Sequence, residues 1–310
     1  MDANLAEIAK KLSSPPGVIV AADESPSTMK SRFDKVGTID SLEMRAKWRE
    51  LIANAPIADA GATGIILHPE MLDIAEVVEP LKKQNIVIIV KIDGGLVDFG
   101  ENGEQTTKFA DDLAALLIKW RELGAAATKF RSVFKISDST PTPELITANA
   151  KVQATLAQMS QNAGLVPMIE PEVLRNGTHN LATDAEVTSR ILDAVFNEVR
   201  KTTVNLATSI LKPNMITSGE DSGEHPTVDE VAVATFEVLR NHTPKELSGI
   251  NFLSGGISDE LSEQYLNRIC RAIVGTPLAI WAGEEKNTKA AQDALVDRVK
   301  RSSLARQGKL

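Results

Sequence analysis

Residues 85–93 read NIVIIVKID, a nearly continuous apolar run that ends in a lysine and an aspartate. A β-strand that is buried on both faces has this pattern, because neither of its sides meets water. Such strands occur in parallel sheets whose two faces are covered by other parts of the chain. The run therefore predicts an interior strand with charged side chains at its carboxyl end.

Six further runs of this kind recur along the chain. They are residues 17–24, 61–69, 126–135, 165–173, 209–215 and 249–256. Longer stretches with apolar residues at helical spacing lie between them, for example 109–124, 182–202 and 228–240. This alternation predicts an α/β protein with a parallel sheet. With this many units, and with no linker rich in Pro, Gly or Ser, we expect residues 1–310 to form a single (β/α)8 barrel domain of the TIM type.

The composition excludes several other classes of protein. The chain is 43% hydrophobic, which is enough for a large core, yet no apolar run is long enough to span a membrane. The net charge of −8 argues against a general nucleic-acid or acidic-membrane surface. One cysteine, Cys270, allows no disulfide within the chain, and residues 1–12 predict an amphipathic helix instead of a signal peptide. We therefore expect a cytoplasmic protein.

Charged and polar side chains recur near the carboxyl ends of the predicted strands. They are Asp23, Lys91, Asp93, Lys129, Arg131, Lys135, Glu170, Glu172, Lys212 and Ser254. In a (β/α) barrel these strand ends form the mouth in which active sites are built. For any one residue, an ion pair that stabilises the barrel end explains the pattern equally well, and Lys135 alone is better explained by solvent exposure. Their recurrence in successive units predicts a site.

The residue types favour an amine as the reactive group. The four histidines show no metal-ligand spacing; they are His68, His179, His225 and His242. The chain contains no G-x-S-x-G and no glycine-rich nucleotide loop. Lys212 lies within the apolar run SILKPNM (209–215), where desolvation or a neighbouring cation lets a lysine lose its proton and attack carbonyls. The product is a Schiff base, and carboxylates move the protons that its formation requires.

Eight segments match one known family. They are AADES (21–25), KIDGG (91–95), TKFRSVFKI (128–136), VPMIEPE (166–172), LKPNM (211–215), FLSGG (252–256), and the later NTKAAQ and SSLARQGK. In this order, over almost the whole chain, they resemble the class I fructose-1,6-bisphosphate aldolases. The resemblance implies a glycolytic and gluconeogenic lyase that cleaves fructose 1,6-bisphosphate reversibly to dihydroxyacetone phosphate and glyceraldehyde 3-phosphate. It further implies a homo-tetramer and a reaction that needs no metal or other cofactor.

The resemblance gives catalytic roles to five residues. Lys212 matches the lysine that forms the Schiff base. Glu170 matches the acid and base that dehydrates the carbinolamine, and Glu172 matches the second glutamate beside it. Lys129 matches the lysine that stabilises the intermediates, and its charge would lower the pKa of Lys212. Asp23 matches the aspartate expected to take the C4 hydroxyl proton.

Other matched residues are expected to bind the substrate. They are Arg131, Lys91, Ser25, Thr28, Ser254, Gly255 and Arg271. Lys91 matches a lysine near the distal phosphate, where Ser25 and Thr28 would add hydroxyl groups, although the family more often has a serine in place of this threonine. Ser254 and Gly255 match the phosphate-binding turn, whose backbone N–H groups suit an anion.

The sequence departs from the family pattern between the FLSGG segment and Arg271. The family has a strand before the matching arginine, whereas here residues 261–270 predict a helix that runs straight into it. On the order of a dozen residues are missing by usual strand and loop lengths. Residues 272–280 are a poor substitute, because Gly275 and Pro277 disfavour a central strand. We therefore expect the eighth strand to be deleted or replaced and the barrel wall to have a gap.

Two alternative functions use the same residues. The missing strand would also suit a catalytically impaired homologue that acts as a binding or scaffold protein. A different Schiff-base lyase would act on another sugar phosphate with the same lysine. The phosphate-binding residues expected at both ends of the site favour a bisphosphate substrate, which argues against the second alternative.

Overall fold

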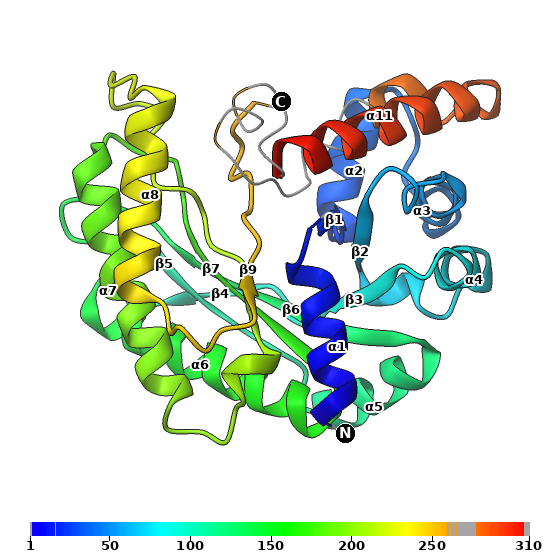
Figure 1. Cartoon of the computed structure of the whole chain (residues 1–310). Helices are drawn as coiled ribbons and strands as arrows, with labels where there is room; N and C mark the ends of the chain where they lie inside the picture. Colours follow the sequence, from blue (N-terminus) through cyan, green and yellow to red (C-terminus); the bar gives the residue numbers. More distant parts are fainter. Residues whose placement is uncertain (1, 16, 259–260, 262–264, 266–276, 307–310) are drawn as a thin grey trace.

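The computed structural model describes residues 2–15, 17–258, 261, 265 and 277–306 (Figure 1). Seven strands form one sheet in this part of the chain: β1 Val18–Ala22, β2 Ala62–Leu67, β3 Val87–Lys91, β6 Ala125–Phe134, β7 Val166–Val173, β8 Ile210–Leu211 and β9 Gly249–Ile250. They are hydrogen-bonded in that order, and every neighbouring pair is parallel. All seven strands predicted from the sequence are confirmed.

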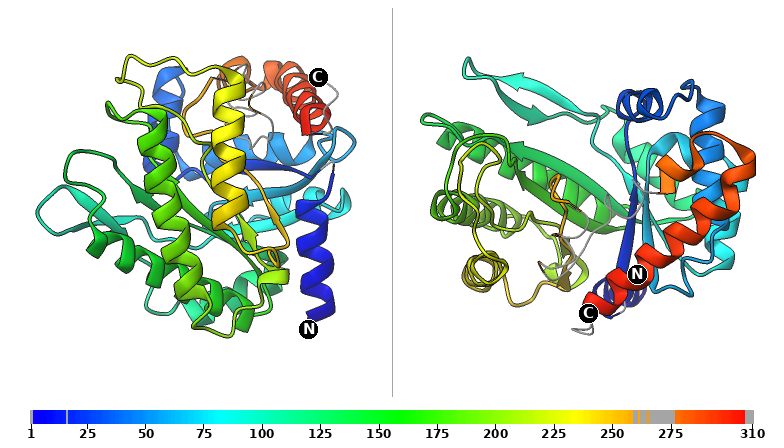
Figure 2. Two further views of the ribbon diagram at one scale, coloured as in Figure 1. Left: turned by 60° about the vertical axis from the view of Figure 1, so that its left-hand side comes forward. Right: turned by 90° about the horizontal axis from the view of Figure 1, so that it is seen from above.

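The sheet curls into a half-barrel (Figure 2). Within the described residues β1 and β9 are its two end strands, and no eighth strand joins them. Among the described residues, the half-barrel agrees with the expectation that the eighth strand is deleted or replaced. Residues 277–281 are helical, so the described part of residues 272–280 does not form a substitute strand. Pro277 is the first described residue of this helical stretch, whereas Gly275 and Arg271 lie outside the described residues.

Helices surround the curled sheet, and most of them lie on its outer side (Figures 1 and 2). They are α1 Asp2–Ser13, α2 Pro26–Lys35, α3 Leu42–Asn54, α4 Ala75–Lys83, α5 Leu113–Leu123, α6 Pro143–Asn162, α7 Leu181–Val199, α8 Val228–His242 and α11 Thr288–Arg306, with short 3₁₀ turns η1 Pro69–Met71, η2 Leu206–Thr208 and η3 Glu285–Asn287. Oxygen-bearing side chains cap several of them, such as Ser41 on α3 and Asn180 on α7. None of the described helices is both long and apolar enough to cross a membrane.

The apolar runs of the strands form the core. In β3, Ile88, Ile89 and Val90 are almost fully buried, as the continuous pattern of this stretch predicts. Each such side chain stabilises the fold by roughly 1.5–3 kcal/mol relative to an exposed position. The core therefore holds the strand ends, and the charged residues on them, in fixed positions.

An antiparallel hairpin, β4 Leu96–Phe99 and β5 Glu104–Thr107, was not predicted from the sequence. β4 has only four residues and β5 (EQTT) is entirely polar, so neither strand shows the long apolar pattern of the sequence runs that were predicted. The hydroxyl of Thr107 donates to the carbonyl of Arg131 at 2.7 Å, and the carboxylate of Glu104 accepts from the backbone N–H of Thr142 at 2.8 Å. The hairpin thereby braces β6 and the N-terminus of α6.

A buried carboxyl group joins α7 to the segment that follows β8. Asp184 accepts hydrogen bonds from the backbone N–H of Thr217 and from the hydroxyl of Thr188, each at 2.8 Å. Burial raises the pKa of Asp184 to about 7, although both hydrogen bonds oppose that rise. The folded protein therefore holds a proton on Asp184 at pH values where the unfolded chain has released it.

This difference predicts how stability depends on pH. The bound proton stabilises the folded state fully below pH 3.8, and the stabilisation is lost as the pH rises to about 7. The loss is on the order of 4 kcal/mol at most. We expect Asp184→Asn to flatten the fall in the free energy of unfolding across this window, measured by urea denaturation. Asp229→Asn, at an exposed position on α8, is the control and should keep the wild-type slope.

Candidate active site

Four charged side chains form a buried chain at the carboxyl ends of the strands. Nζ of Lys129 lies 2.8 Å from Oδ2 of Asp23 and 2.7 Å from Oε2 of Glu170. The other carboxylate oxygen of Glu170 accepts a hydrogen bond from Nζ of Lys212. Each of the four is at most 5% exposed. Two cations and two anions in alternation offset one another, which is the condition under which buried charges are tolerated.

The parallel register explains why these residues meet. Lys129 on β6 and Glu170 on β7 belong to neighbouring strands, in which Arg131 pairs with Glu170. The backbone N–H of Lys212 donates to the carbonyl of Ile169 at 2.8 Å, which places Lys212 directly after β8 and beside β7. Asp23 follows β1 across the mouth. The strand ends thus deliver to one place the residues that the sequence groups together.

A second layer of ion pairs lies around this chain. Glu172 shares a face of β7 with Glu170, because side chains alternate along a strand, and it lies 2.9 Å from Nη1 of Arg131. Lys91 at the end of β3 lies 3.1 Å from Asp93. Among the described residues, four of the expected cations each have a carboxylate partner: Lys91, Lys129, Arg131 and Lys212.

The hydroxyl groups of Ser25 and Thr28 lie at the N-terminus of α2. Ser25 caps this helix: its Oγ accepts from the backbone N–H of Thr28 at 3.3 Å and lies 3.0 Å from the hydroxyl of Thr28. In the described part of the chain neither hydroxyl bonds to Lys91. The structure brings the two hydroxyl groups together. Their role in capping α2 accounts for this position without a bound ligand.

The predicted phosphate turn lies beside Lys212. Ser254 and Gly255 line a small cavity of about 10 Å³ with Glu170, Glu172 and Lys212, which is room for about one water molecule. Gly255 and Gly256 both have positive φ, at 57° and 85°, a conformation that glycine adopts without strain. Leu253 donates its backbone N–H to the carbonyl of Pro213 at 3.0 Å and so fixes the turn against the lysine segment.

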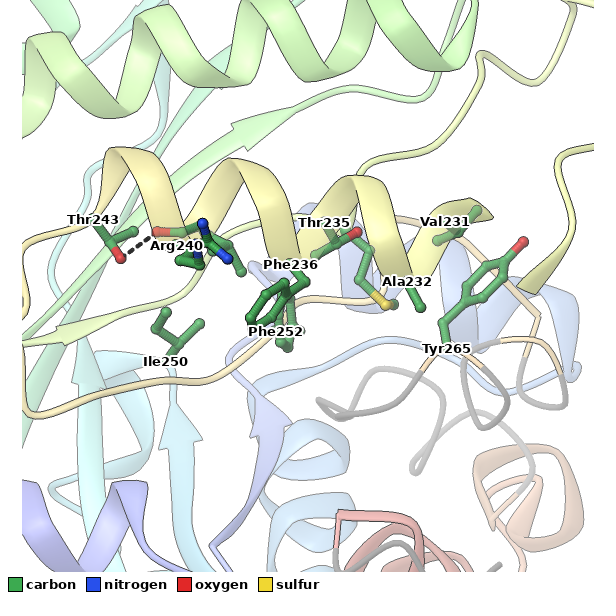
Figure 3. Close-up of a pocket in the computed structure, with 11 residues that line it drawn as sticks. Val231, Ala232, Thr235, Phe236, Arg240, Thr243, Ile250, Phe252 and Tyr265 are labelled. Atoms are coloured by element: carbon green, nitrogen blue, oxygen red, sulfur yellow. Dashed lines mark hydrogen bonds between the residues drawn. The ribbon is translucent and has the colours of Figure 1, made fainter. Parts of the chain in front are cut away.

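A larger cavity of about 490 Å³ lies elsewhere, between α8 and the segment after β9 (Figure 3). Its lining is mostly apolar and includes Met215, Phe236, Phe252 and Tyr265. None of the predicted site residues lines it. Catalysis needs groups that move protons or stabilise charge, so the small charged cavity is the better candidate despite its size.

Sequence reasoning missed a buried arginine beneath Asp23. Arg49 on α3 donates from Nε to the carbonyl of Ala22 and from Nη2 to Oε2 of Glu24, both at 2.7 Å. Arg32 lies 2.8 Å from the other oxygen of Glu24. These bonds hold the backbone on both sides of Asp23. The sequence feature that could have indicated such an arginine is Glu24, because a carboxylate that follows a buried strand requires a partner.

The remaining predicted residue, Arg271, lies outside the described residues. Among the residues that the structure does describe, no three His, Cys, Asp or Glu side chains are arranged to hold a metal ion.

A curled parallel sheet with charged side chains at its carboxyl ends defines an enzyme of the (β/α)-barrel type. The family model for class I fructose-bisphosphate aldolase matches residues 4–310. The fructose-bisphosphate aldolase of Drosophila melanogaster is 36% identical over 327 aligned positions, which cover 98% of this chain and 90% of that protein. The non-muscle aldolase of Lethenteron camtschaticum is 37% identical with the same coverage.

A solved structure agrees with the sequence relatives. It is the fructose-bisphosphate aldolase from Plasmodium falciparum in complex with TRAP and a small-molecule inhibitor, with a TM-score of 0.95 and 32% sequence identity. The match covers 99% of this chain and 95% of that one. The chain belongs to the class I fructose-bisphosphate aldolase family, and the aldolase activity predicted from the sequence is confirmed.

Proposed function

We propose that the chain carries out its aldolase reaction through a Schiff base on Lys212. The observation that supports this most directly is the buried chain Asp23–Lys129–Glu170–Lys212. Lys212 is 3% exposed, and removal of an amine from water disfavours its ammonium form. The neutral amine is the nucleophile that attacks a carbonyl.

The first half of the proposed reaction forms the covalent intermediate. Nζ of Lys212 adds to the C2 carbonyl of fructose 1,6-bisphosphate and gives a carbinolamine. Glu170 then donates a proton to the carbinolamine hydroxyl, which leaves as water, and a protonated imine remains. Glu170 suits this role because one of its oxygens already contacts the amine of Lys212.

The second half breaks the carbon–carbon bond. Asp23 takes the proton of the C4 hydroxyl, the C3–C4 bond breaks, and its electron pair passes into the protonated imine. Glyceraldehyde 3-phosphate leaves, and the enamine that remains is protonated at C3 and hydrolysed to dihydroxyacetone phosphate. Lys129 lies between the carboxylates of Asp23 and Glu170, so its charge stabilises both while protons move.

The remaining matched residues are proposed to hold the substrate. They are Arg131, Lys91, Ser25, Thr28, Ser254, Gly255 and Arg271. Lys91, Ser25 and Thr28 would contact the distal phosphate, whereas the Ser254–Gly255 turn would bind the phosphate nearer Lys212. Glu172 would orient Arg131, to which it is bonded at 2.9 Å.

We further propose that residues 1–310 form one aldolase domain that assembles as a homo-tetramer in the cytoplasm. The family model supports the single domain because it matches nearly the whole length. The family resemblance supports the tetramer, the cytoplasmic location and a reaction without a metal.

Borohydride trapping tests this function directly. Borohydride added with dihydroxyacetone phosphate reduces the Schiff base to a stable amine, and we expect mass spectrometry of peptides to locate the adduct on Lys212. EDTA should leave the activity intact. Unmodified Lys212, together with complete loss of activity in EDTA, would show that another mechanism operates.

A further inference from the structure

The four described cations that the family match places in the site are balanced by carboxylates. The pairs are Lys91 with Asp93, Lys129 with Asp23 and Glu170, Lys212 with Glu170, and Arg131 with Glu172. With Lys212 as the ammonium ion, these four cations and four carboxylates sum to no net charge, and with Lys212 as the neutral amine the sum is negative. A phosphate group carries about −1.5 to −2 at neutral pH. A site that binds a bisphosphate therefore needs positive charge beyond these pairs.

Arg175 lies at the same mouth, and no carboxylate among the described residues is paired with it. It follows the end of β7 by two residues, and its carbonyl accepts the backbone N–H of Glu220 at 2.8 Å. Its Nε is buried without a hydrogen-bond partner, and no carboxylate of the described chain forms an ion pair with it. A buried donor without an acceptor is unfavourable unless a ligand satisfies it.

The side chain of Arg175 packs against the phosphate turn. A methyl group placed on Gly255 would lie 3.9 Å from Cδ of Arg175. Within the described residues the backbone N–H groups of Ser254, Gly255 and Gly256 find no protein acceptor. An arginine beside unpaired amides of a turn is an arrangement that suits an oxyanion.

The neighbours of Arg175 do not neutralise it. Burial lowers the pKa of His179, and the charge of Arg175 lowers it further, so this histidine is neutral at pH 7. Burial raises the pKa of Tyr265, and Arg175 opposes that rise. Both influences place the charge of Arg175 close to these side chains, and neither side chain is an anion at pH 7.

We propose that Arg175 binds the phosphate that the substrate places at the Ser254–Gly255 turn. The proposal rests on the proposed function, because that function sets which phosphate lies there. The planar guanidinium can donate two parallel hydrogen bonds to phosphate oxygens, and it supplies the positive charge that the paired cations do not. Arg175 is thus a substrate-binding residue that sets affinity for a phosphorylated ketone.

The test compares Arg175→Gln and Arg175→Lys with the wild-type protein. Calorimetric titration with dihydroxyacetone phosphate should show a dissociation constant about ten-fold higher or more for Arg175→Gln, as expected for a lost charge-assisted hydrogen bond. Arg175→Lys should recover part of the affinity, because it keeps the charge without the planar geometry. Arg200→Gln, at an exposed position, is the matched control and should bind as wild type does.

Dihydroxyacetone is a ketone without a phosphate, and it separates a loss of phosphate binding from a change in the shape of the site. The rate of borohydride trapping with dihydroxyacetone should be equal in wild type and Arg175→Gln. Equal dissociation constants for dihydroxyacetone phosphate would overturn the proposal, and so would an equal loss with both ketones. Absence of trapping in every variant, combined with the expected calorimetric difference, would refute the Schiff base while it upholds the role of Arg175.

Discussion

Lys212→Met is expected to lower kcat by about 10⁴- to 10⁶-fold, the usual effect of removing a nucleophile. Methionine fills a similar volume at this position, which is 3% exposed, so the surrounding packing is expected to persist. Lys129 keeps its bonds to Asp23 and Glu170 in this variant. The measurement is steady-state cleavage of fructose 1,6-bisphosphate, together with trapping by borohydride, and no adduct should form.

Lys135→Met is the matched control for this experiment. Lys135 directly follows β6, the strand of Lys129, but its side chain is exposed. The control variant should retain wild-type kcat and the trapped adduct. Residual activity of Lys212→Met above about one per cent of wild type, or an adduct on another lysine, would contradict the assignment of the nucleophile.

The strands were predictable because a strand that is buried on both faces appears in the sequence as a nearly continuous apolar run. β3 and β7 are apolar almost throughout, and each ends in the charged residues that the mouth requires. β8 and β9 contain only two residues each, far fewer than their apolar runs suggest. Pro213 explains part of this difference, because it has no N–H to continue the ladder beyond Lys212.

The buried chain of charged residues was predictable for a related reason, whereas the arginines around it were not. A lysine or glutamate within a buried strand is costly, so Lys129, Glu170 and Lys212 stand out from their neighbours. Arg49 and Arg175 lie on a helix and a loop, where charged residues are ordinary. Only the fold shows that the first is buried against Glu24 and that the second packs on Gly255.

The gap in the wall also has a counterpart in the alignment. The 327 positions aligned with the Drosophila melanogaster relative exceed the 310 residues of this chain, so the relative has residues that this chain lacks. Asn251 directly follows β9, and its side-chain amide donates to the carbonyls of Leu12 and Gly17, at 3.3 and 3.4 Å. This amide links the two end strands of the half-barrel near the start of β1. Of the four side chains proposed to be catalytic, Asp23 follows β1, whereas Lys129 and Glu170 lie on β6 and β7 and Lys212 follows β8. The ion pairs among them form without an eighth strand among the described residues.

Glu170→Gln is expected to affect both chemistry and stability, because Glu170 contacts Lys129 and Lys212 at once. Glutamine keeps the shape but neither carries the anion nor acts as an acid at neutral pH. We expect kcat to fall by about 10²- to 10⁴-fold, the usual contribution of a general acid or base. Glu170 is an anionic partner of two buried lysines, and removal of one partner from a buried pair costs about 3–5 kcal/mol.

Two measurements separate these effects. Urea denaturation gives the loss in free energy of unfolding, and the rate of adduct trapping with dihydroxyacetone phosphate reports the chemical step under conditions where the variant is folded. Glu237→Gln, at an exposed position on α8, is the matched control, because it makes the same change of residue type away from the site. If Glu170 served only the fold, the folded variant would form adduct at the wild-type rate. Slow trapping in Glu170→Gln, with wild-type trapping in Glu237→Gln, would instead identify Glu170 as the group that moves the proton during carbinolamine dehydration.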